Sequence, residues 1–170
     1  MNNKYDPINF SKQLIKGRIA ETLFEQMLRD TDCFTILKFG YESILPELAQ
    51  HQYDIHTQET MEIIRRAPDF AVINNKTHDV HLIEVKYMMN PETKWTLPDA
   101  ERIYKSWKPA YLFLITPNGF YFDKASIIVK NKGVVSPLNH PDIPKSLQNK
   151  YIKILNEFII PSRQLDEEGL

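Results

Sequence analysis

The chain has 170 residues, of which 42% are hydrophobic and 25% are charged, as is usual for a globular protein with a buried core. Its 21 basic and 22 acidic residues leave a net charge of −1, which excludes a broadly basic coat for nucleic acid and leaves only a local cluster for binding phosphate. No apolar run reaches membrane-spanning length and no signal peptide is recognisable, so we expect one cytoplasmic domain over residues 1–170 with a flexible tail at 162–170.

The first helix is predicted to begin at Asn9 or Ser11 and to end near residue 28. Apolar residues recur at helical spacing and form one broad face: Leu14, Ile15, Ile19, Ala20, Leu23, Phe24, Met27 and Leu28. Glu21 falls at the margin of this face, whereas Glu25 lies about 40° farther round toward solvent. An acid on the rim of a helix is ordinarily a solvated surface residue, so its position alone assigns Glu21 no role.

A strand is predicted at residues 33–39, which are rich in β-branched and aromatic side chains. Cys33 is the only cysteine of the chain; we expect it to be a small core residue, and an internal disulfide is excluded. Glu42 follows this strand and is a secondary candidate for an acidic site residue. Residues 43–66 read as a helical insertion, which either covers the sheet or recognises a substrate.

Residues 65–87, with the sequence RRAPDFAVINNKTHDVHLIEVKY, are predicted to form a β-hairpin. Two segments that are apolar on nearly both alternating faces, as in strands buried within a sheet, flank a polar turn. A loop that folds symmetrically about the bond between Lys76 and Thr77 places Asp69 directly opposite Glu84. Opposed residues of an antiparallel pair have Cβ atoms about 5 Å apart, and like charges so placed repel. We therefore expect a cation between these two acids.

Lys86 lies two residues beyond Glu84 and should point to the same side, while Val85 points to the opposite face. A hard divalent cation held by two carboxylates beside a lysine suits phosphodiester hydrolysis, because the metal acidifies a water and stabilises developing negative charge. The alternative is a group of charges at the solvated end of a strand. The aligned register, the buried flanking strands and Pro68, which fixes the backbone before Asp69, favour the site.

The remainder of the chain is predicted to continue with helices and strands. A helix at about residues 97–107 presents one apolar stripe, and the apolar strand that follows at 110–115 should run parallel to an earlier strand. Shorter strands are expected at 120–122 and 127–129, and a C-terminal helix at about 144–158.

Pro68-Asp69, then a hairpin, then Glu84-Val85-Lys86 resembles the signature of the PD-(D/E)XK nuclease superfamily, which includes many restriction endonucleases and Holliday junction resolvases. The resemblance implies a restriction endonuclease-like α/β fold, with an α-β-β-β-α-β core and a central mixed sheet flanked by helices. It also implies a magnesium-dependent nuclease, with an endonuclease acting on DNA as the expected activity and Mn²⁺ as a substitute for Mg²⁺. Asp69, Glu84 and the backbone carbonyl of Val85 would bind the metal, and Lys86 would position or deprotonate the attacking water.

The resemblance extends in order over residues 17–116 and includes the first helix. Gly17-x-x-x-Glu21 is similar to a motif of many superfamily nucleases, in which the glycine permits close approach and the acid faces the metal. Glu21 is thereby implied as a further metal-binding and catalytic residue.

Four basic residues are weaker candidates for contacts with nucleic acid. Arg65 and Arg66 precede the hairpin and could hold phosphates bidentately, and Lys105 and Lys108 lie off the apolar stripe of their helix. DNA is the expected partner, RNA and a homodimer or partner protein remain open, and no membrane partner is expected. Two rival interpretations are a catalytically silent nucleic-acid-binding or subunit-bridging domain with the same fold, and an accidental motif in an unrelated protein.

Overall fold

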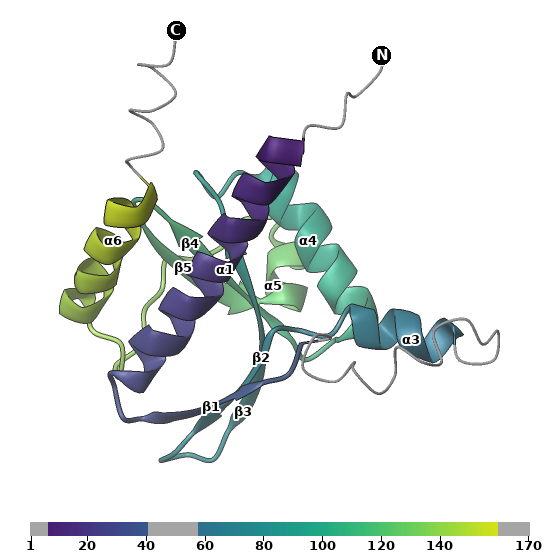
Figure 1. The fold of residues 1–170 in the computed structure, drawn as a ribbon. Coiled ribbons are helices and arrows are strands. Elements are labelled where there is room, and N and C mark those ends of the chain that lie inside the picture. Colours follow the sequence, from purple (N-terminus) through teal and green to yellow (C-terminus); the bar gives the residue numbers. More distant parts are fainter. Residues whose placement is uncertain (1–6, 41–57, 160–170) are drawn as a thin grey trace, which may run out of the picture.

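The computed structural model describes residues 7–40 and 58–159, which build a five-stranded mixed sheet covered by helices (Figure 1). The strands are β1 Phe34–Lys38, β2 Phe70–Asn74, β3 Val80–Tyr87, β4 Tyr111–Thr116 and β5 Gly119–Lys124. They lie in the order β1-β2-β3-β4-β5. Only the β3–β4 pair is parallel; the other three pairs are antiparallel. The prediction of a mixed α/β fold with helices flanking the sheet is confirmed.

The helices are α1 Pro7–Arg29, α3 Gln58–Arg65, α4 Thr93–Ser106, α5 Ala125–Lys130 and α6 Lys145–Ile159. Figure 1 shows α1 and α6 on one side of the sheet and α4 and α5 on the other. No helix in the described part of the chain is long and apolar enough to cross a membrane.

Each face of the sheet has its own core, and strand β4 contributes to both. Phe113 and Ile115 pack with α1 and α6, whereas Leu112 and Leu114 pack with α4 and α5. This alternation is what a strand buried on both faces requires. Strand β4 runs parallel to an earlier strand, as predicted, and that strand is β3.

Residues 127–129 were predicted as a strand, and this prediction is wrong because they lie within α5. Ala125 and Ile128 lie three positions apart on α5, and both are fully buried against the core beneath α4. Packing on a helical period therefore outweighs the β-branched composition of this segment.

The apolar faces predicted for the first and last helices include residues that the structure leaves exposed. Leu14 and Ile15 are 56% and 58% exposed, and Phe158 on α6 is 65% exposed. Helix α4 begins at Thr93 rather than at 97. Its Thr96 is buried and its hydroxyl donates to the Gly133 carbonyl, which joins α4 to the segment after α5.

Within the predicted insertion at 43–66 the structure describes α3, at 58–65, and the one residue after it, Arg66. Glu42 and the tail at 162–170 lie outside the described residues.

Candidate functional site

The β2–β3 hairpin has the register that its sequence predicts. Phe70 pairs with Ile83 and Ala71 with Leu82, so Asp69 lies one step beyond the ladder, opposite Glu84. The Val85 backbone N–H donates to Asp69 Oδ2 at 2.8 Å. Asp69 is thus held against β3 at the open end of the hairpin.

The backbone of Asp69 is fixed from the other side by the end of β1. Its carbonyl oxygen accepts hydrogen bonds from the N–H groups of Phe39, at 2.8 Å, and Gly40, at 3.1 Å. Pro68 before it is buried. A residue outside the regular ladder therefore has a defined position at the centre of the site.

Asp69 lies where a negative charge is unfavourable. Burial and the nearby charge of Glu84 raise its pKa from 3.8 to about 7, and Glu21 adds to this effect. The Val85 N–H and the Lys86 ammonium act in the opposite direction without overcoming it. The positive charge near Asp69 is therefore too weak to offset its desolvation and the two neighbouring acids.

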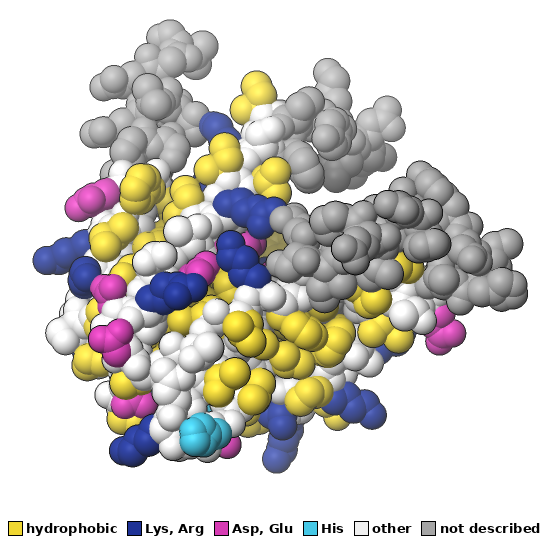
Figure 2. All heavy atoms as spheres, turned by 60° about the horizontal axis from the view of Figure 1, so that its bottom comes forward, with side chains coloured by type: hydrophobic (Ala, Val, Ile, Leu, Met, Phe, Trp, Pro, Cys, Tyr) yellow, Lys and Arg dark blue, Asp and Glu magenta, His cyan; other side chains and the backbone are white. Residues whose placement is uncertain are grey.

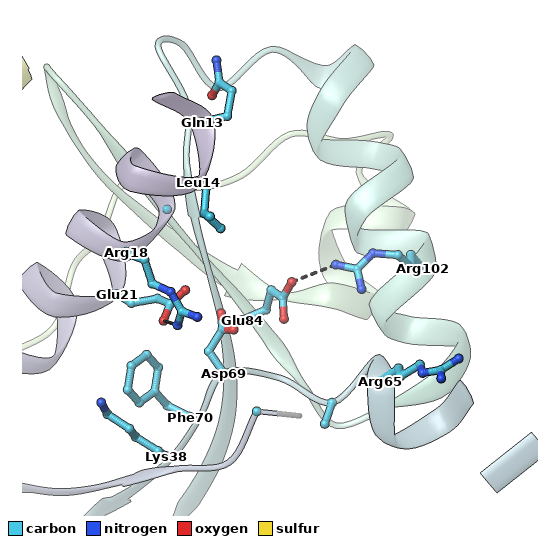
Figure 3. Close-up of a pocket in the computed structure, with 13 residues that line it drawn as sticks. Gln13, Leu14, Arg18, Glu21, Lys38, Arg65, Asp69, Phe70, Glu84 and Arg102 are labelled. Carbon is cyan, nitrogen blue, oxygen red and sulfur yellow. Dashed lines mark hydrogen bonds and ion pairs between the residues drawn. The ribbon is translucent and has the colours of Figure 1, made fainter. Parts of the chain in front are cut away.

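Glu84 is only 7% exposed and is balanced by two cations. Arg102 on α4 donates from Nη2 to Glu84 Oε1 at 2.8 Å (Figure 3), and Lys86 Nζ lies 3.4 Å from the same oxygen. The side-chain period of two thus brings Lys86 to Glu84, as predicted.

Arg102 is a site residue that the sequence reasoning missed. The sequence does contain a signal for it. Two opposed acids require a nearby cation, and α4, the helix that follows the hairpin, carries basic residues. Relative to Ile103, which is fully buried, Arg102 lies about 100° round the helix. Lys105 lies about 160° away, and Lys108 lies beyond the end of α4 at Ser106. Of these three basic residues, Arg102 is therefore the nearest to the buried stripe.

Glu21 reaches the same site from α1. It lines a cavity of about 590 Å³ together with Asp69 and Glu84, and Arg18 Nη1 lies 3.2 Å from its carboxylate. Figure 3 shows these three acids gathered between α1 and α4. The implied convergence of Glu21 with the hairpin acids is therefore present in the structure.

The prediction that Glu25 faces solvent is wrong. Its side chain is 18% exposed, compared with 29% for Glu21. Glu25 is held by Arg29 at 2.8 Å and by Lys38 at 4.0 Å, and unlike Glu21 it is not among the described residues that line the cavity. The carboxylate of Glu25 is therefore engaged by these ion pairs rather than by solvent.

Gly17 also borders the cavity, but not for the reason that the resemblance implies. A Cβ placed on Gly17 would meet no atom within 4 Å, so the glycine is not required for close packing with the rest of the chain. It leaves open space at the cavity instead.

Basic side chains surround the acids, although only part of the predicted set is among them. Arg18, Lys38, Arg65 and Arg102 line the cavity, and Figure 2 shows Lys and Arg side chains gathered round recessed acidic ones. The Arg65 guanidinium points away from the acids in Figure 3, and it pairs with Glu62 at 3.0 Å.

The other predicted basic contacts are not brought to the acids. Arg66 pairs with Glu62 at 3.5 Å, and neither it nor Lys105 or Lys108 is among the described residues lining the cavity. Lys86 lines an adjoining cavity of about 230 Å³ that also touches Asp69 and Glu84.

Within the described residues, no group of three or more His, Cys, Asp or Glu side chains is arranged to hold a metal ion. The three acids share a cavity, but Arg102 holds Glu84 and Arg18 holds Glu21. Their carboxylate oxygens are nevertheless the donor type that Mg²⁺ prefers.

A scan against models of protein families finds no match, and a search of curated protein sequences finds none either.

Proposed function

We propose that the protein is a magnesium-dependent nuclease that hydrolyses DNA phosphodiester bonds at a PD-(D/E)XK site. The observation that carries the proposal is the opposition of Asp69 and Glu84 across the hairpin, with Lys86 on the same side 3.4 Å from Glu84. Asp69 is half-buried, and desolvation together with the charge of Glu84 raises its pKa to about 7. Perturbed acids in a cavity are typical of functional sites.

The order of elements supports the same proposal. From α1 to β4 the described residues, 7–40 and 58–116, run helix, strand, helix, strand, strand, helix, strand. If α3 is counted as part of the insertion, this is the α-β-β-β-α-β order that the superfamily resemblance implies. A restriction endonuclease-like core is therefore part of the proposal.

The residues fit a hard divalent cation. Asp69, Glu84 and Glu21, together with the Val85 carbonyl, would hold it. When bound, the cation would acidify a water molecule and offset negative charge on the phosphate. Positive charge at this position would also lower the pKa of Asp69 and keep its carboxylate ionised.

The remaining roles fall to basic side chains. Lys86 is 34% exposed, so its ammonium can donate to a water at the cavity mouth and position it. Only its neutral amine would take a proton from that water. Arg102 carries five N–H donors in a planar fork, so it can keep its bond to Glu84 and still donate to a phosphate oxygen. Arg18 on α1 faces the same cavity from the opposite side and is a second candidate for this contact.

One specific observation favours a second candidate function. Glu84 and Glu21 already pair with arginines of the same chain, at 2.8 Å and 3.2 Å. Such pairing is expected in a site where basic side chains, rather than a metal ion, balance the acids. The alternative is a catalytically silent domain that binds nucleic acid or bridges subunits.

The two functions are separated by a cleavage assay on linear, nicked, single-stranded and branched DNA, with RNA included. We expect cleavage with Mg²⁺ or Mn²⁺ and none in EDTA. Binding of these substrates without cleavage under either metal would establish the silent domain instead. Cleavage that persists in EDTA would contradict the metal-dependent assignment.

A further inference from the structure

A second concave surface adjoins the three acids, and the proposed chemistry leaves it unused. This surface, which we name the side groove, encloses about 690 Å³ between the N-terminal half of α1, the end of β3 and the first turns of α4. Six of its residues carry the argument: Gln13, Lys16, Tyr87, Met89, Lys94 and Trp95. The elements that bound it lie together at the upper end of the molecule in Figure 1.

The side groove is continuous with the catalytic cavities. Gln13, Lys16 and Tyr87 line both the groove and the smaller cavity that contains Asp69, Glu84 and Lys86. A polymer with one phosphate at the acids would therefore continue into this groove.

Of the two aromatic side chains of the groove named above, Trp95 is open to solvent and Tyr87 is half-buried. The Trp95 side chain is 61% exposed on the first turn of α4, although an indole ring is ordinarily mostly buried in a monomer. Tyr87 closes the groove on the strand side, and Met89 nearby is 40% exposed. Flat, exposed rings next to an acid-lined cavity can stack with planar ligands.

The charges of the groove suit an anionic chain. Lys16 Nζ lies 5.8 Å from the centre of the Tyr87 ring, and Lys94 Nζ lies 5.5 Å from that of Trp95. Two acids also line the groove: Glu92 pairs with Lys94 at 2.7 Å, and Asp99 lies 3.8 Å from Arg102, which also holds Glu84. Lys16 is therefore the cation on which the phosphate contact rests. Rings with ammonium groups alongside are the combination that binds the bases and phosphates of single strands.

We propose that the side groove binds unpaired nucleotides adjoining the scissile phosphate, with a base stacked on Trp95 and the sugar-phosphate chain beside Lys16. This inference rests on the proposed nuclease function and adds a substrate class to it, namely nucleic acid with a single-stranded segment. Each base within a duplex already stacks on its neighbours, so both of its faces are covered. Trp95 should therefore not increase the affinity of the groove for duplex nucleic acid.

The first test measures binding without cleavage, in a Glu84→Gln background. Labelled oligodeoxythymidine, oligouridine and a blunt DNA duplex are titrated with protein and followed by fluorescence anisotropy. Trp95→Ala should weaken binding of both single strands about tenfold and leave the duplex unchanged. Trp95→Phe keeps a ring and should retain most of the affinity. Oligodeoxyuridine, which differs from oligouridine only in the sugar, shows which sugar the groove accepts.

A matched control comes from the same helix. Tyr104 is 38% exposed and lies nine positions from Trp95, on about the opposite side of α4. Tyr104→Ala should leave the affinity for single strands unchanged. Equal losses in Trp95→Ala and Tyr104→Ala, or an equal loss for duplex and single strands in Trp95→Ala, would overturn the inference.

A direct readout is available because the chain has two tryptophans. Trp107→Phe leaves Trp95 as the only indole, and binding of oligodeoxythymidine or oligouridine should quench its emission. Absence of quenching at saturation would overturn the inference and point to a protein occupant of the groove.

The groove and the chemistry can fail separately. Selective binding of single strands through Trp95, with no cleavage by wild type under any metal, would keep the groove and remove the proposed nuclease. Metal-dependent cleavage of a blunt duplex as fast as of a single-stranded substrate, unchanged in Trp95→Ala, would keep the nuclease and overturn the groove.

Discussion

Asp69 couples the stability of the fold to pH. Its pKa is about 7 in the folded chain, against 3.8 for an ordinary aspartate, because of burial and the charge of Glu84. The folded protein therefore binds this proton more tightly than the unfolded chain. The resulting stabilisation is complete below about pH 4 and is lost as the pH rises through about 7.

Asp69→Asn removes this titration while keeping an oxygen that can accept the Val85 N–H. The free energy of unfolding of wild type, relative to the variant, should fall by on the order of 4 kcal/mol between about pH 4 and about pH 8. Urea unfolding of both proteins across this range measures the difference. A difference that stays constant with pH would show that Asp69 is ionised in the fold like a surface acid.

Arg102 and Arg65 both line the cavity, but their partners differ in burial. Arg102 pairs with Glu84, whose side chain is 9% exposed, whereas Arg65 pairs with Glu62, which is 52% exposed. Arg102→Ala leaves a buried carboxylate with only Lys86 and should cost roughly 1–3 kcal/mol. Arg65→Ala should cost less than about 1 kcal/mol. Denaturant unfolding compares them, and equal costs would contradict the structural role of Arg102.

The sequence predicts some residues of the site and not others for a physical reason. Asp69, Glu84 and Lys86 follow from a symmetric hairpin and a period of two, both of which are local rules. The helical period places Arg102 near the buried stripe of α4, but its contact with Glu84 depends on how α4 crosses the sheet, which no local pattern encodes. Glu25 was predicted to face solvent because a helical wheel gives the direction of a side chain but not its neighbours. In the structure Arg29 and Lys38 lie over Glu25 and pair with it.

At the scale of elements, α1 carries two acids four positions apart with different surroundings. Glu21 lines the cavity with Asp69, whereas Glu25 is engaged by Arg29. Glu21→Gln should lower the cleavage rate by at least about tenfold and be partly rescued by high Mn²⁺. Glu25→Gln should change stability by less than about 1 kcal/mol and leave the rate near that of wild type. If the two variants have the same rate, Glu21 is not a site residue and Glu42 becomes the next candidate.

Gly17 gives a second test on the same helix. Because a Cβ there meets no neighbouring atom, Gly17→Ala should stabilise α1 by about 0.5–1 kcal/mol. The added methyl group enters space beside the acids, so the same variant should bind or cleave substrate more weakly. Thermal melting and the cleavage rate should therefore move in opposite directions. A variant that is less stable than wild type would mean that the glycine is needed by the fold.

Elements whose burial follows one simple period were predicted well. The hairpin register, β4 and α6 are of this kind. Helix α5 was mistaken for a strand because its β-branched residues have extended propensity, whereas contacts with the core beneath α4 decide its conformation. The exposed Leu14 and Phe158 show the converse, since apolar spacing predicted burial where residues 7–40 and 58–159 supply no covering element.

At the scale of the whole molecule, the near-zero net charge conceals a local arrangement. Basic residues from α1, β1, α3 and α4 line the cavity that contains the acids. The sequence predicted the α/β class and a strand parallel to an earlier one, but not which earlier strand pairs with it. That pairing, β3 with β4, depends on contacts far apart in the chain. It lets α4 cross beside the acids and bring Arg102 to them.

The central claim is that Asp69, Glu84 and Lys86 form one metal-dependent site. The most direct test is the rate of Mg²⁺-dependent DNA cleavage by Asp69→Ala, Glu84→Ala and Lys86→Ala, each checked for folding by circular dichroism. Glu101→Gln and Lys153→Ala, at exposed positions on α4 and α6, are the controls. We predict that each site variant folds and loses cleavage by at least about a hundredfold, while the controls keep the wild-type rate. Full activity in a folded Glu84→Ala variant would contradict the account.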